Sequence, residues 1–106
     1  MQSVFKKGNL AYEKDNSNNY DGCSPTGYPS NIFTGKIAMI DNGNCTFGYK
    51  CLKAQQAGAI GVVIVNQVPG GGTIVMGTDS WTSQVNIPCV MISYEDGQYL
   101  KNLIQT

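Results

Sequence analysis

Cysteine is the residue type in this sequence with the most chemistry open to it. The four cysteines are Cys23, Cys45, Cys51 and Cys89, and no two of them form a CxxC pair. Because the chain has no histidine, a zinc site would have to gather all of these scattered thiolates. Disulfide bonding in an exported protein is therefore the favoured interpretation, ahead of buried free thiols.

The cysteines permit more than one pairing. We favour Cys23 with Cys45, since turn residues flank both. Cys51 and Cys89 are then expected to face each other across a helix–sheet interface, either paired or as free thiols that act as small apolar side chains. A thiol redox function through Cys45 and Cys51 is a remote alternative. Lys50 and a helix N-terminus could lower the pKa of one of these thiols. The distance that their spacing gives along a helix, however, makes a disulfide between Cys45 and Cys51 difficult to close.

Other catalytic or ligand-binding patterns are incomplete. Without histidine, the Ser–His and Cys–His nucleophile pairs are excluded within this chain. Oxygen donors alternate between residues 15 and 21, but Tyr20 and Thr26 stand where a calcium-binding loop needs glycine and an acidic residue. The glycine run 70–72 is followed by the strand-like stretch 73–77 and not by a helix, as a phosphate site would require. The sequence predicts no catalytic residue, metal or cofactor.

Composition indicates one globular domain over residues 1–106. Hydrophobic residues make up 42% and charged residues 13%, while seven basic residues balance seven acidic ones. A net charge of zero argues against a nucleic-acid partner and against electrostatic membrane recruitment. No apolar run is long enough to insert into a membrane, and residues 1–8 lack the apolar core of a signal peptide. We expect a domain excised from a larger secreted or cell-surface protein.

A strand–helix–strand unit forms the centre of the chain. Continuous apolar runs at 37–40 and 60–65 enclose a helical stretch from 46 to 57, which predicts strands covered on both faces. Thr46 is expected to cap the helix with its hydroxyl and Gly58 to end it. Phe47, Cys51 and Ala54 share the expected buried face, and the outward side carries Lys50, Lys53 and Gln56.

The flanking segments are predicted from shorter signals. Two apolar pieces between residues 4 and 12 suggest a small hairpin, and residues 13–30 read as a long polar loop. A third apolar run at 89–92 leads into a last helix that Ser93 is expected to cap, with Asp96 placed for a return contact. Leu100, Leu103 and Ile104 form the apolar face of that helix.

Aromatic residues in the polar loops are the candidate protein-binding positions. Tyr20 and Tyr28 lie in the loop 15–28, and Trp81 lies in the loop 69–81. Aromatic side chains flanked by Asn, Ser and Gly are typical anchors of binding surfaces. The alternative interpretation is that Tyr28 and Trp81 cover the ends of the core.

A set of short motifs is distributed along most of the chain, from about Asp21 to Ile104. They are Asp21-Gly22-Cys23-Ser24-Pro25, Gly35-Lys36-Ile37, Gly43, Cys45-Thr46-Phe47, Lys50, Ala54-Gln55, Ala57-Gly58-Ala59, Ile87-Pro88, Ser93 and Asp96-Gly97. In these positions the chain resembles the protease-associated (PA) domain family. The departures are Asn42, where a basic residue is common, Tyr49, where an acidic one is common, and the additional Cys51 and Cys89.

This resemblance implies an α/β (mixed β/β/α) swivelling fold, with a β-sheet or open barrel flanked by two short helices. It also implies a non-catalytic accessory module of a secreted peptidase, which helps substrate access or binds protein segments. The implied partners are protein or peptide segments, or the catalytic domain of the same parent chain. A binding module of a non-peptidase receptor or cell-surface protein is the alternative, because the same fold serves both.

Overall fold

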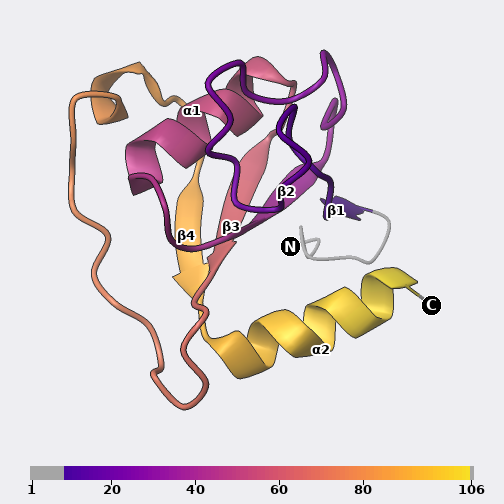
Figure 1. Cartoon of the computed structure of the whole chain (residues 1–106), viewed down its shortest axis with the longest axis vertical. Helices are drawn as coiled ribbons and strands as arrows, with labels where there is room; N and C mark the ends of the chain where they lie inside the picture. The colour runs from indigo at the N-terminus through magenta and orange to yellow at the C-terminus, as the bar shows by residue number, and fades with distance from the viewer. Residues whose placement is uncertain (1–8, 106) are drawn as a thin grey trace, which may run out of the picture.

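The predicted α/β architecture is confirmed. The computed structural model describes residues 9–105. Its strands form one parallel sheet in the order β1-β2-β3-β4, with helix α1 and helix α2 beside it (Figure 1). The elements are β1 Leu10–Ala11, β2 Ile37–Asp41, α1 Phe47–Gln56, β3 Gly61–Val65, the 3-10 helix η2 Thr82–Gln84, β4 Cys89–Ile92 and α2 Tyr94–Gln105.

The central strands are apolar from Ile37 to Ile40 and from Val62 to Val65, because both faces of the sheet are covered there. Strand β2 pairs with β3 from Ile37 opposite Gly61 to Asp41 opposite Val65. Successive side chains then point to opposite faces, which produces two separate cores. The α1 side contains Ala38, Ile40, Val62, Ile64, Cys51 and Ala54. The α2 side contains Ile37, Met39, Val63, Val65, Leu100 and Ile104.

Helix α1 ends as predicted but begins differently. Gly58 has φ +96°, its N–H donates to Gln55 O, and the N–H of Ala59 donates to Ala54 O. These are the two hydrogen bonds of a Schellman motif. Thr46 occupies the N-cap position, yet its side chain makes no capping hydrogen bond. The predicted hydroxyl cap is therefore wrong.

Ser93 caps helix α2 as predicted, and the helix packs unusually close to the sheet. The N–H of Asp96 donates to Ser93 Oγ at 3.1 Å. A Cβ built on Gly97 would collide with Val65 Cγ1, so only glycine fits at this contact. Gly97 weakens helix propensity, but it permits the close approach of α2 to β3.

Three local expectations changed. Residues 73–77 form no strand. Lys50 does not lie on the outward side of α1, since its side chain is fully buried. The expected hairpin falls partly on residues 1–8, outside the described part of the chain, and Leu10–Ala11 instead pairs parallel to β2. Within residues 9–105, no helix has the length and apolar character needed to cross a membrane.

Candidate protein-binding surface

The long polar loop before β2 is ordered by one buried carboxylate. Asp15 is 5% exposed, and its Oδ1 accepts hydrogen bonds from the N–H groups of Ser17 and Asn19 at 2.9 and 3.1 Å. Its Oδ2 accepts the N–H of Ser24 at 3.2 Å. The alternating oxygen donors of this loop thus stabilise its own turns, as Asp and Asn side chains commonly do.

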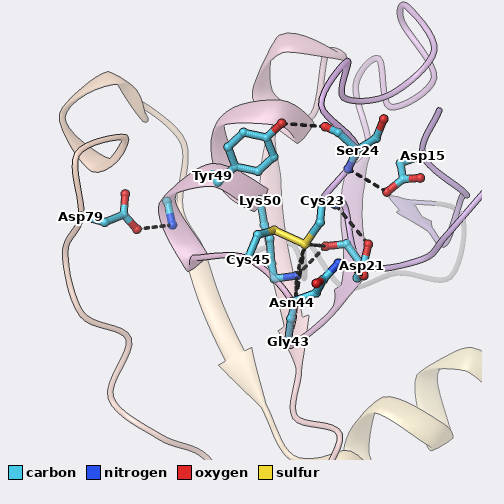
Figure 2. The surroundings of a disulfide bond; sticks show 11 residues. Asp15, Asp21, Cys23, Ser24, Gly43, Asn44, Cys45, Tyr49, Lys50 and Asp79 are labelled. Atoms are coloured by element: carbon cyan, nitrogen blue, oxygen red, sulfur yellow. Dashed lines mark hydrogen bonds between the residues drawn. A yellow bond between two sulfur atoms is a disulfide. The ribbon is translucent and has the colours of Figure 1, made fainter. Parts of the chain in front are cut away.

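A buried lysine fastens this loop to the turn between β2 and α1. Lys50 Nζ donates to the carbonyl oxygens of Asp21 and Gly43 at 2.5 and 2.7 Å, and lies 3.3 Å from Cys23 Sγ (Figure 2). Burial lowers the pKa of Lys50 to about 8, although the nearby negative charge of Asp21 acts in the opposite direction. Lys50 therefore holds two segments of the chain together from inside.

The favoured disulfide joins the same two segments. Cys23 and Cys45 are bonded, with an S–S distance of 2.07 Å and Cα atoms 5.7 Å apart. Beside the bond, Asn44 Nδ2 donates to Asp21 Oδ2 at 3.2 Å (Figure 2). Of the alternatives left open for the other two cysteines, the structure has Cys51 and Cys89 as free thiols.

The N-terminus of α1 is capped from a distant loop. Asp79 Oδ2 accepts the N–H of Gly48 at 2.9 Å, and Asp79 Oδ1 accepts the N–H of Trp81 at 2.8 Å. Partial burial raises the pKa of this carboxyl, but the backbone hydrogen bonds from Trp81 and Gly48 outweigh it, so the pKa lies below its ordinary value. Farther along α1, Gln55 bonds to Gln84 O and to the N–H of Asn86. The loop 66–88 is thus attached along the helix.

These attachments place an aromatic pair on the outer side of α1. The rings of Tyr49 and Trp81 meet edge to face with centroids 5.3 Å apart, and Lys53 Nζ lies 5.1 Å from the centre of the Tyr49 ring. The hydroxyl of Tyr49 donates to Ser24 O at 2.6 Å, which fixes the ring, while Trp81 remains 38% exposed. We call Tyr49, Lys53 and Trp81 the aromatic surface.

Comparison with known proteins identifies the family. The family described as "PA domain" matches residues 6–100. This chain belongs to the PA domain family. The PA domain is 40% identical over 84 residues to leucine aminopeptidase 2 of Trichophyton equinum, and 36% identical over 84 residues to the probable leucine aminopeptidase 2 of Aspergillus fumigatus. Each match covers 79% of this chain but only 16% and 17% of the respective relative.

A solved structure supports the same assignment. The zinc aminopeptidase BSAP from Bacillus subtilis matches with a TM-score of 0.53 and 28% sequence identity. The match covers 68% of this PA domain and 17% of that chain. The PA domain therefore spans about one sixth of the length of the aminopeptidases it resembles.

The three predicted anchors occupy different environments in the PA domain. Trp81 is on the surface, as a binding role requires. Tyr28 is only 7% exposed and packs edge to face on Phe33 at 4.7 Å, so its predicted surface role is wrong and the core interpretation holds. Tyr20 is half-buried and stacks on Tyr12 at 4.1 Å, in a cluster of contacts separate from the aromatic surface.

Tyr49 and Lys53 were not among the predicted anchors. Lys53 was assigned to the outward side of the helix, and Tyr49 was noted only as a departure from the family pattern. Tyr49 and Lys53 are four residues apart, about one helical turn, so they lie on the same face of α1. That spacing was the available signal, but only the position of the distant Trp81 shows that the face carries an aromatic pair.

Proposed function

We propose that this PA domain is a non-catalytic accessory module of a larger secreted aminopeptidase, and that it binds protein segments at the aromatic surface. The main support for the proposal is that the PA domain matches only about one sixth of the length of each aminopeptidase. A piece of that size, with no histidine in its sequence, is better suited to an accessory role than to metal-dependent hydrolysis.

The geometry of the aromatic surface supports binding of an extended peptide. Trp81 offers a partly exposed ring, and Tyr49 holds it edge to face. Because the loop and the helix are joined through Asp79, little side-chain or loop entropy is left to lose on binding. Lys53 adds a positive charge beside the rings, which favours peptide carbonyl or carboxylate groups.

A secreted location fits the chemistry of the fold. The Cys23–Cys45 disulfide joins two segments that also share the hydrogen bonds of Lys50. Disulfides of this kind form and persist in oxidising compartments outside the cytosol.

The catalytic part of the proposal is tested with the purified domain. We expect no release of chromophore from leucine 4-nitroanilide, with or without added Zn²⁺, because the sequence has no histidine to bind a catalytic zinc ion. Hydrolysis that co-purifies with the domain through a second column and is removed by a chelator would refute the non-catalytic assignment.

The binding part is tested by titrating unstructured peptides and following tryptophan fluorescence. Trp81 is the only tryptophan, so the signal comes from the aromatic surface. For the comparison of variants, affinity is measured by calorimetry, where Trp81→Ala is expected to weaken binding at least ~10-fold. Tyr99→Ala is the matched control, since Tyr99 is 65% exposed on α2 and makes no part of the surface. Equal losses in both variants would count against the assigned site.

A further inference from the structure

Two free thiols from distant parts of the chain contact each other on the α1 side of the sheet. Cys51 lies in the middle of α1, and Cys89 is the first residue of β4. Their side chains are within hydrogen-bonding contact. Cys51 is 3% exposed, whereas Cys89 is partly exposed. The pair therefore combines one enclosed sulfur with one that solvent reaches.

Both thiols line a single cavity under the loop 66–88. Its volume is about 190 Å³, and the loop contributes Met76, Gly77 and Thr78 to its wall. No other cysteine lines this cavity; Cys23 and Cys45 are already bonded to each other. A small disulfide that enters beside Cys89 would meet only this thiol pair.

We propose that Cys51 and Cys89 are an oxidisable pair, which closes to a second disulfide when the domain meets a disulfide donor such as oxidised glutathione. The bond would join α1 to β4 directly, within the core cluster on which both side chains already pack. The inference does not depend on the accessory role proposed above, because it concerns only the chemistry of the two sulfurs.

The exchange proceeds in two displacements. The Cys89 thiolate attacks one sulfur of the donor, the donor S–S bond breaks, and one glutathione thiolate leaves. The Cys51 thiolate then attacks the Cys89 sulfur of the mixed disulfide and expels the second glutathione thiolate. Two electrons pass to the donor, and the two protons lost by the cysteines convert the leaving thiolates to thiols.

The surroundings of the two thiols indicate which of them attacks the donor first. The hydrogen bond from Cys51 lowers the pKa of Cys89, whereas the same bond and burial raise the pKa of Cys51. Cys89 is also the more exposed of the two. It is therefore suited to attack first, and the enclosed Cys51 is suited to resolve the mixed disulfide.

The test equilibrates the native chain in glutathione buffers of increasing oxidised fraction, blocks remaining thiols with N-ethylmaleimide and measures intact mass. In oxidising buffer we expect neither Cys51 nor Cys89 to be alkylated. The intact mass should then be about 2 Da below that of the unalkylated protein with only the Cys23–Cys45 disulfide, because two hydrogen atoms are lost. Peptide mapping without reduction should recover Cys51 linked to Cys89. The thermal midpoint should rise by about 10 °C, as expected when a long loop is closed.

Two single variants separate the steps. Cys51→Ser should accumulate a mixed disulfide with glutathione at Cys89, and Cys89→Ser should leave Cys51 unmodified in the folded protein. Wild-type chain that keeps two alkylatable thiols in the most oxidising buffer would overturn the proposal. A stable glutathione adduct on the wild type, or a bond from either thiol to Cys23 or Cys45, would overturn it as well.

Discussion

Replacing Lys50 with methionine should remove a specific pH dependence from the stability of the domain. Methionine keeps the length and apolar stem of the side chain but has neither the charge nor the hydrogen bonds to Asp21 and Gly43. At neutral pH two opposing effects act together, namely the loss of these bonds and the relief of a buried charge. The change of stability with pH isolates the second effect.

The direction follows from the lowered pKa. In the folded protein the pKa of Lys50 is about 8, against 10.5 for the ordinary side chain. Between these values the unfolded chain binds the proton more tightly, so the free energy of unfolding rises with pH. Below about pH 8 both states are protonated and the wild type carries the full penalty. A pKa change of this size corresponds to at most about 3 kcal/mol, and after allowing for screening we expect about 2 kcal/mol between pH 7 and pH 10.

The assay is urea denaturation of wild type and Lys50→Met at several pH values from 7 to 10. Both proteins carry Cys51→Ser and Cys89→Ser, so that thiol–disulfide exchange does not intervene at high pH. Burial raises the pKa of Tyr12 and Tyr28 in the folded protein. The domain therefore loses stability when these tyrosines ionise in the unfolded chain near pH 10, but this loss is common to both proteins. The wild type should gain stability relative to the variant as pH rises. Parallel curves would refute the reasoning.

Three further predictions concern contacts between distant segments, each measured by chemical denaturation. Asp79→Ala should destabilise the domain by about 1 kcal/mol through loss of the α1 cap, and the difference from wild type should shrink as pH falls through the lowered pKa of Asp79. Gly97→Ala should cost about 2 kcal/mol because its Cβ collides with Val65, whereas Gly77→Ala, in open space, should change stability by less than about 0.5 kcal/mol. Cys23→Ser combined with Cys45→Ser should cost about 3 kcal/mol, and an unchanged urea midpoint would contradict a stabilising role for the bond.

Local signals in the sequence predicted the elements that local physics determines. The apolar runs gave β2, β3 and β4 because both faces of the sheet are covered, and Gly58 marked the end of α1 because its φ is positive. Ser93 marked the start of α2, because its hydroxyl accepts a hydrogen bond from the N–H of Asp96 in the first turn. Such features depend on residues a few positions apart.

The errors at Lys50 and at the cap of α1 involve partners far along the chain. Helical spacing placed Lys50 outward, because nothing local shows that residues 21 and 43 present carbonyl groups to its ammonium. The cap of α1 was assigned to Thr46, but Asp79 performs it from the loop 66–88. Tyr28 was expected at the surface because its neighbours are polar, although the loop folds back and buries the ring on Phe33. Contacts from other segments decided the first two cases, and the fold of the polar loop itself decided the third.

The central claim is that this PA domain binds protein segments at the aromatic surface, and a nuclear magnetic resonance titration tests it most directly. The ¹⁵N-labelled chain is titrated with an unstructured peptide mixture prepared from a denatured protein. We predict the largest shift changes at the Trp81 indole N–H and at the amides of Tyr49 and Lys53, with α2 around Tyr99 unaffected. Unchanged spectra at saturating peptide, or changes centred on α2, would contradict the account.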